Sequence, residues 1–222
     1  MHRFIKRRLD RMRLKDSAYA YLLDAPPADE VVSIDCETTG LNTRKDDIVS
    51  IAAIKIRGNR ILTSEAFQAT VKPEAHMAAD SIKIHHILRA DVARENRIET
   101  VLPDLLRFIG SRPLVGYWID FDVNMLNKNV SRLIGIKLPN ARFDVSDLYY
   151  DRKYAKAPPG TKLDLRFAQI LCDLNLPPLD AHNAFDDALS TAQMYVVLKD
   201  LKARGVYLRR ARSSDAWLPP IG

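Results

Sequence analysis

The sequence has few cysteines and no long apolar run. Two cysteines, Cys36 and Cys172, among 222 residues argue against a disulfide-stapled secreted domain. No apolar run approaches the roughly 20 residues that a membrane-spanning helix needs. The basic N-terminus is not followed by the apolar stretch of a secretory signal. We therefore expect a cytoplasmic protein with reduced thiols and no membrane span.

The charge is distributed unevenly along the chain. The net charge is +6, but residues 1–16 and 201–212 each carry +5, so the body is mildly acidic. Basic ends suit a polyanion such as nucleic acid, although a solvated terminal helix and tail would look the same. With 47% hydrophobic and 28% charged residues, the composition is that of one ordinary globular domain.

Three strands are predicted in the first third of the chain. Apolar runs predict strands over 31–36, 47–56 and 61–71, and Gly58-Asn59 is a plausible tight turn between the last two. We expect an antiparallel meander.

Helical periodicity dominates the remainder. Helices are predicted over 98–109, 122–134, 146–150, 163–174 and 184–203, with short strands over 113–118 and 141–143. Residues 3–23 predict one basic amphipathic helix with Ile5, Leu9 and Met12 on a stripe. A meander followed by β-α units implies a mixed sheet covered by helices.

Two acids follow the first predicted strand closely. Asp35 and Glu37 are two residues apart, so in an extended chain their side chains project from the same face. Carboxylates that close repel each other unless a cation lies between them. Hard oxygen ligands favour magnesium or manganese over zinc.

Further acids and one histidine occupy the starts of later helices. Asp122 opens the helix after the strand at 113–118, and Asp120 is its rival. His182 precedes Asp187 by five residues, which a helix would rotate by about 500°. We therefore expect His182 on the entering loop and Asp187 on the first turns of the helix.

These residues resemble the motifs of the DnaQ-like 3′–5′ exonucleases of the DEDDh type, which include the proofreading epsilon subunit of bacterial DNA polymerase III, RNase T and oligoribonuclease. The matching segments are Asp35-Cys-Glu37-Thr-Thr-Gly-Leu41, Phe121-Asp122, His182 with Asp187, and Ser81-Ile-Lys-Ile-His85. The resemblance covers roughly residues 30–203. It divides the chain into a basic N-terminal helical segment (1–29), an exonuclease domain (30–203) and a basic C-terminal tail (204–222).

The resemblance implies a ribonuclease H-like α/β fold with a mixed five-stranded sheet. It implies two Mg²⁺ or Mn²⁺ ions held by Asp35, Glu37, Asp122 and Asp187, with Asp35 bridging them. His182 would be the general base that takes a proton from the attacking water. The expected reaction releases nucleoside 5′-monophosphates from a free 3′ end, with single-stranded DNA as the expected substrate.

The resemblance also implies contacts to the terminal nucleotide, with Leu41 as a wedge against its base. The expected contact residues are Thr38, Thr39, Gly40, Leu41, Phe121 and His85. The sequence departs from the family at Tyr117 and Trp118, where the family often has His-Asn. Those two aromatic residues could stack on bases or pack in the core or at its rim.

Three alternatives stay open at this point. The domain could dock on a replication or repair assembly through the N-terminal helix rather than act mainly as an enzyme. It could be an RNA-processing exoribonuclease, because no motif here reads the 2′-hydroxyl. The basic helix could also lie on an anionic membrane surface.

Overall fold

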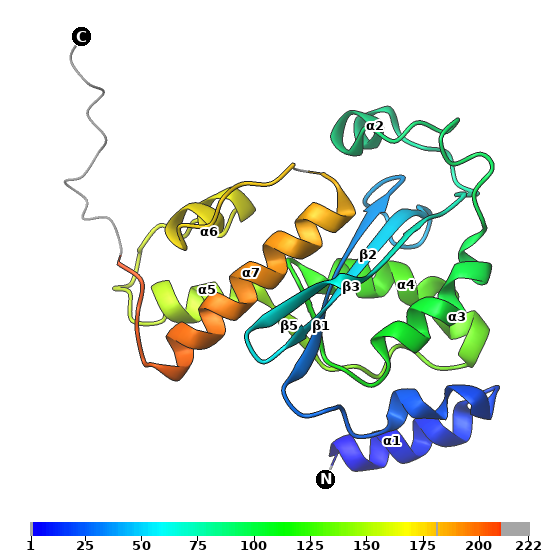
Figure 1. Cartoon of the computed structure of the whole chain (residues 1–222), viewed down its shortest axis with the longest axis horizontal. Coiled ribbons are helices and arrows are strands. Elements are labelled where there is room, and N and C mark those ends of the chain that lie inside the picture. Colours follow the sequence, from blue (N-terminus) through cyan, green and yellow to red (C-terminus); the bar gives the residue numbers. More distant parts are fainter. Residues whose placement is uncertain (1, 181, 210–222) are drawn as a thin grey trace.

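A mixed sheet forms the centre of the molecule in the computed structural model, which describes residues 2–180 and 182–209. Within these residues the sheet has five strands in the order β3-β2-β1-β4-β5 (Figure 1). The strands are β1 (Glu30–Thr38), β2 (Ile48–Arg57), β3 (Arg60–Thr70), β4 (Leu114–Gly116) and β5 (Arg142–Asp144). β1, β2 and β3 are antiparallel neighbours, and β4 and β5 run parallel to β1. The predicted meander and mixed sheet are confirmed.

Helices cover both faces of this sheet. They are α1 (His2–Arg13), the 3₁₀-helix η1 (Ser17–Leu23), α2 (Ala79–His85), α3 (Ile98–Ile109), α4 (Ile119–Ile134), α5 (Val145–Lys153), α6 (Phe167–Asp173) and α7 (Ala184–Ala203). α3 and α4 cover one face, while α5, α6 and α7 lie on the other. In the described part of the chain, none of these helices combines the length and apolarity that crossing a membrane requires.

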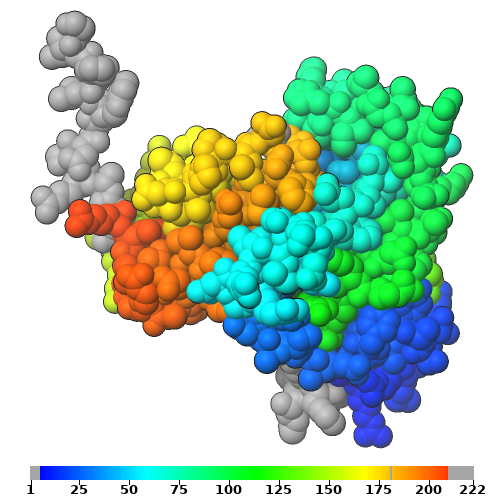
Figure 2. Space-filling view, viewed as in Figure 1, coloured from blue at the N-terminus to red at the C-terminus, as the bar shows by residue number. Residues whose placement is uncertain are grey.

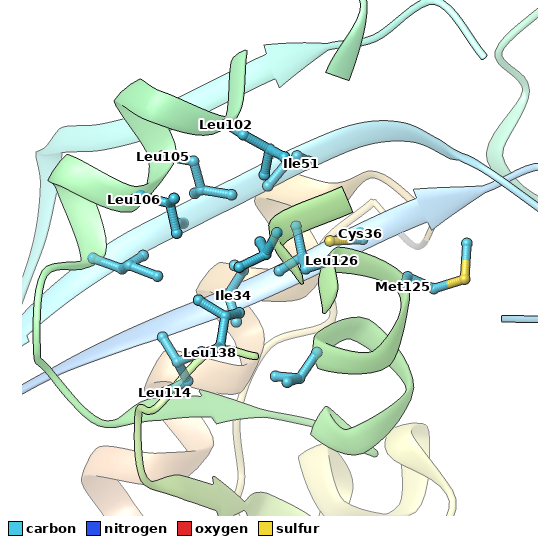
Figure 3. Close-up of a cluster of buried hydrophobic side chains, with 14 of the residues drawn as sticks. Ile34, Cys36, Ile51, Leu102, Leu105, Leu106, Leu114, Met125, Leu126 and Leu138 are labelled. Carbon is cyan, nitrogen blue, oxygen red and sulfur yellow. The ribbon is translucent and has the colours of Figure 1, made fainter. Parts of the chain in front are cut away.

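The alternation of side chains along β1 assigns each residue to one of these layers. Ile34 and Cys36 pack with Leu105 and Leu126 in the core beneath α3 and α4 (Figure 3). The intervening residues face α7, and the Ser33 hydroxyl donates to the Ala188 carbonyl oxygen at 2.8 Å. Because side chains alternate in a strand, the odd-numbered acids of β1 are directed toward the α7 layer.

The prediction of one helix over 3–23 is wrong. α1 ends at Arg13, the Lys15 amide donates to the Ile134 carbonyl oxygen at 3.0 Å, and the Asp16 carboxylate caps η1 through the Ala18 amide at 2.8 Å. A tertiary hydrogen bond and a new N-cap therefore end one helix and begin another. The expected apolar stripe faces solvent, since Leu9 is 45% and Met12 77% exposed; the side chain of Ile5 lies outside the description.

Other boundaries differ at helix starts. α4 begins at Ile119 rather than at residue 122, because the Ile119 amide donates to the Asp144 carboxylate at 3.1 Å. α6 spans 167–173 rather than 163–174, and α2 was not predicted. α7 spans the predicted residues 184–203. α1 lies at the end of the sheet where β1 begins, and α2 lies at the other end (Figures 1 and 2).

Candidate active site

Asp35 and Glu37 occupy the carboxyl end of the central strand. They pair with Ala52 and Ser50 of β2, and the register shifts between Glu37 and Thr38. β1 lies between β2 and β4 in the middle of the sheet, so both carboxylates emerge where the central strand ends. Their position on alternate residues places them on the face that α7 covers.

Asp187 completes a compact group of acids. It lies in the first turn of α7, whose N-cap is Asn183, with the Asn183 side chain accepting from the Phe185 amide at 3.0 Å. One carboxylate oxygen from each of Asp35, Glu37 and Asp187 lies within 4.8 Å of the other two. Three hard oxygen donors at this spacing fit a divalent cation such as Mg²⁺ or Mn²⁺.

The charges of these acids are costly in the protein alone. Burial, followed by the charges of Asp122, Glu37 and Asp187, raises the pKa of Asp35 well above its usual value. Burial and the charge of Asp187 raise the pKa of Glu37 to about 7. Burial also raises the pKa of Asp187. A bound cation would remove this repulsion, so the donor set fits a metal on electrostatic as well as geometric grounds.

Asp122 reaches the same region from the opposite layer. Its side chain is 4% exposed, and its Oδ1 accepts from the Cys36 amide at 3.0 Å. Burial raises its pKa to about 8, and its charge contributes to the raised pKa of Asp35. It is not among the three acids whose oxygens lie within 4.8 Å. Asp120, its rival, is exposed and pairs with Arg142, so the structure places Asp122 rather than Asp120 beside the acids.

His182 lies where the spacing predicted, on the loop that enters α7. Its backbone has φ 65°, and its amide donates to the Asp187 carboxylate at 3.1 Å. The residue is exposed. A loop histidine is thus tied through its backbone to a helical acid of the cluster, while its imidazole stays accessible to solvent.

A cleft of about 430 Å³ opens beside Glu37. Its lining includes five of the predicted contact residues, namely Thr38, Gly40, Leu41, His85 and Phe121. Leu41 is 86% exposed at its mouth. A Cβ on Gly40 would lie 2.5 Å from Asp46 Oδ2, so any larger residue there would require the Asp46 side chain to move.

Thr39 does not line this cleft. It is fully buried, and its hydroxyl oxygen accepts from the Asp47 amide at 3.0 Å. Ala78, Ser81 and Ile84, from α2 and its N-cap, line the cleft instead. Sequence reasoning missed them because it had not predicted α2; the resemblance of the segment that ends at His85 was the available signal.

His85 forms the back of the cleft. It is 5% exposed, and its Nδ1 accepts from the Ile87 amide at 3.0 Å. The hydrogen of the neutral ring is therefore on Nε2, which is buried and has no hydrogen-bond partner. Burial lowers the pKa of His85.

Comparisons with known proteins identify the family of this chain. Residues 32–195 match the family model RNase_T, described as Exonuclease. The chain is 31% identical over 170 residues to a DNA polymerase III subunit epsilon of Rickettsia felis, covering 75% of this chain and 72% of that protein. It is 28% identical to the corresponding subunit of Aquifex aeolicus, covering 77% and 81%. Against the PolC-type DNA polymerase III of Thermotoga maritima it is 28% identical but spans only 11% of that protein.

Solved structures share the fold. Escherichia coli Exonuclease I in complex with a dT13 oligonucleotide has a TM-score of 0.67 at 18% identity, over 79% of this chain and 42% of that one. Exonuclease X in complex with 5′ overhanging duplex DNA has a TM-score of 0.58 at 24% identity, over 80% and 95%. The ribonuclease H-like fold is thereby confirmed, and the chain belongs to the DnaQ-like, RNase T family of 3′–5′ exonucleases.

Proposed function

We propose that this protein is a metal-dependent exonuclease that removes nucleoside 5′-monophosphates from the 3′ end of single-stranded DNA. The observation that carries this proposal is the meeting of Asp35, Glu37 and Asp187 within 4.8 Å, next to a cleft that Glu37 lines. Their raised pKa values leave a strong demand for positive charge. Domain 30–203 would carry this activity, and the two basic ends would be accessory.

The four acids would hold two Mg²⁺ or Mn²⁺ ions. Asp35, Glu37 and Asp187 offer the compact donor set, and Asp122 would act directly or through water. Bound divalent ions supply the positive charge that stabilises the attacking and leaving oxygens of a displacement at phosphorus. The carboxylates themselves hold that charge at the centre of the sheet edge.

His182 would be the general base. Its ring is exposed beside Asp187, and the hydrogen bond from its backbone to that carboxylate fixes the loop next to the cluster. A histidine near neutral pH can accept the proton of the attacking water and later release it to solvent.

The terminal nucleotide would occupy the 430 Å³ cleft. Leu41 and Phe121 offer apolar contacts to its base, and His85, which is buried, closes part of the cleft wall. Thr38 and Gly40 complete the wall, and the absence of a side chain at Gly40 lets the ligand approach the backbone closely.

The test uses 5′-labelled DNA and RNA oligomers, single- and double-stranded, with Mg²⁺, Mn²⁺ or EDTA. We expect stepwise shortening of single-stranded DNA from the 3′ end, which EDTA abolishes. Asp187→Asn and Asp122→Asn should each abolish the release of nucleotides. Asp186→Asn and Asp120→Asn, at half-exposed and exposed acids beside them in the sequence, are the matched controls and should keep activity. His182→Ala should lose about 10²–10⁴-fold in kcat. Full activity in both Asp187→Asn and Asp122→Asn would refute the proposal. If the wild-type protein shortens RNA faster than DNA, the preferred substrate is RNA and not DNA.

A second candidate role is docking to a replication or repair assembly, and α1 favours it. The helix buries Asp10 and exposes Leu9 and Met12, with Arg8 and Arg13 also exposed. Because α1 lies at the end of the sheet opposite α2, partner binding there would leave the acidic site free. Leu9→Ser with Met12→Ser should then weaken capture by such an assembly without changing the hydrolysis of a short oligomer. If the assembly captures the wild-type protein and the double variant equally well, α1 does not have this docking role.

A further inference from the structure

Trp118 adopts a backbone conformation that does not suit its side chain. Its φ and ψ are 56° and 39°, in the left-handed region. Among the described residues, the other non-glycine residues with positive φ are Asp29, His86, Asn175 and His182. Those residue types adopt this conformation with several-fold enrichment, whereas for a bulky side chain it is an outlier.

Packing does not compensate for this strain. The Trp118 side chain is 63% exposed, and the ring of Tyr117 lies beside it with 6.1 Å between the ring centroids. Nor does Trp118 cap α4, because an indole cannot accept a hydrogen bond from the first turn and no side-chain cap is present. Asparagine or glycine would fit this position better for folding alone.

The residues on both sides hold Trp118 in place. The Tyr117 hydroxyl donates to the Leu165 carbonyl oxygen at 3.1 Å, and its ring meets Phe167 edge-on at 5.2 Å. On the other side, the Ile119 amide donates to Asp144 at 3.1 Å. An exposed aromatic ring is thus presented from a fixed backbone, which is what a binding surface requires and a fold does not.

Trp118 lies at the end of the sheet where β1 ends and the acids emerge. It follows β4, which is parallel to β1 and pairs with it directly. The carboxyl ends of parallel neighbours share one edge, so Trp118 emerges beside the strand end that carries Asp35 and Glu37. It also precedes Phe121, a wall residue of the cleft, by three positions and Asp122 by four.

We propose that Trp118 is a stacking platform for a base upstream of the terminal nucleotide of the single strand. The inference rests on the proposed exonuclease function and adds a positioning residue to it. An aromatic ring that stacks on a base tolerates any sequence, because every base has a π-face. Trp118 would therefore hold the strand in register for successive cleavages and would favour single-stranded over paired substrate.

A binding experiment tests the platform without depending on hydrolysis. The chain has two tryptophans, so Trp217→Phe leaves Trp118 as the only tryptophan, which is excited selectively over the tyrosines. Titration of that variant with oligo-dT in EDTA or Ca²⁺ should quench its fluorescence. Fluorescence polarisation then measures the affinity for labelled oligomers that each carry one abasic residue, placed in turn at the second to fifth positions from the 3′ end. At one of these positions the abasic residue should lower the affinity of wild type but not that of Trp118→Asn. No quenching, or equal abasic profiles in both proteins, would overturn the inference.

Kinetics and stability give the second test. Trp118→Asn should raise KM for single-stranded DNA by about 5- to 150-fold, the equivalent of 1–3 kcal/mol per stacked base, with kcat little changed. The same variant should unfold at a higher urea concentration, because it relieves the left-handed strain, and Trp118→Phe should retain most of the affinity. If wild type binds but hydrolyses nothing, the exonuclease proposal fails while the abasic scan still decides the platform. If wild type hydrolyses and Trp118→Asn has an unchanged KM, only the platform fails.

Discussion

Replacing Glu37 with glutamine should stabilise the metal-free protein while destroying the site. Burial and the charge of Asp187 raise the Glu37 pKa from 4.5 to about 7. The folded protein therefore keeps a proton that the unfolded chain releases between these values, so stability falls as pH rises through this window. Each pH unit between the two pKa values lowers the free energy of unfolding by about 1.4 kcal/mol. Glutamine preserves the shape and removes the ionisation.

The expected magnitude depends on pH in a defined way. In EDTA, Glu37→Gln should increase the free energy of unfolding by about 2 kcal/mol at pH 6 and about 3 kcal/mol at pH 8. Below about pH 4.5 the two proteins should differ little, because the carboxyl is protonated in both states. Urea denaturation followed by circular dichroism at pH 4.5, 6 and 8 measures the difference. Glu95→Gln, at an exposed acid far along the chain, controls for the loss of one charge.

Divalent metal should reverse the order of the two proteins. A divalent cation that binds only the folded state raises its stability by an amount that grows with the logarithm of the cation concentration relative to Kd, and wild type offers one more anionic ligand than Glu37→Gln. Wild type should therefore gain more from metal, and the gain should be larger at pH 8 than at pH 6. An equal response of both proteins, or no stabilisation of Glu37→Gln in EDTA at pH 8, would refute the electrostatic account of this site.

Three further substitutions probe the frame around the site, each by urea denaturation. Asp144→Ala should lower the free energy of unfolding by about 2–4 kcal/mol, with Asp147→Ala as the matched control. The Asp144 carboxylate accepts from the Ile119 amide at the start of α4 and from the Ser146 amide at the start of α5. Each of these caps is worth about 1–2 kcal/mol. His86→Gly should stabilise by about 1 kcal/mol, since the C-cap of α2 has φ 57°. Leu105→Ala, in the fully buried core, should cost about 2–5 kcal/mol. Unchanged stability in Asp144→Ala, or a loss in His86→Gly, would contradict the respective account.

Long, strongly patterned segments were predictable from the sequence. The three meander strands and α7 lie close to their predicted ranges, because side-chain alternation and helical spacing report burial directly. Residues of α7 such as Ala188 and Leu198 are buried against the sheet and α5.

Features that depend on tertiary contacts were not predictable. The break after α1 comes from a hydrogen bond between Lys15 and Ile134, and the early start of α4 comes from Asp144. The stripe of Leu9 and Met12 satisfies helical periodicity yet faces solvent, because Asp10 takes the buried position. Periodicity indicates a helix but not which of its faces the rest of the chain will cover.

The site shows the same division between local and tertiary information. Spacing alone placed Asp35 and Glu37 on one face and His182 on a loop, because both inferences use the geometry of a single element. Nothing in the spacing indicates that Asp122 would approach from the opposite layer through the Cys36 amide. Its role rests on the Phe121-Asp122 resemblance and on burial, while the geometry excludes Asp120 from this position.

The carboxyl edge of the sheet concentrates the features that folding alone would not select. By contrast, α3 and α4 bury their apolar faces, and Asp16, Asp144 and Asn183 cap the starts of η1, α5 and α7. At this edge, buried acids repel one another and a tryptophan occupies a left-handed backbone position. Each departure lowers the stability of the free protein. Cations would offset the repulsion of the acids, and under the proposal above the exposed ring of Trp118 would gain a stacked base. Since both ligands would bind at the same end of the strands, the strain there is what we expect of the proposed site for metal and single-stranded nucleic acid.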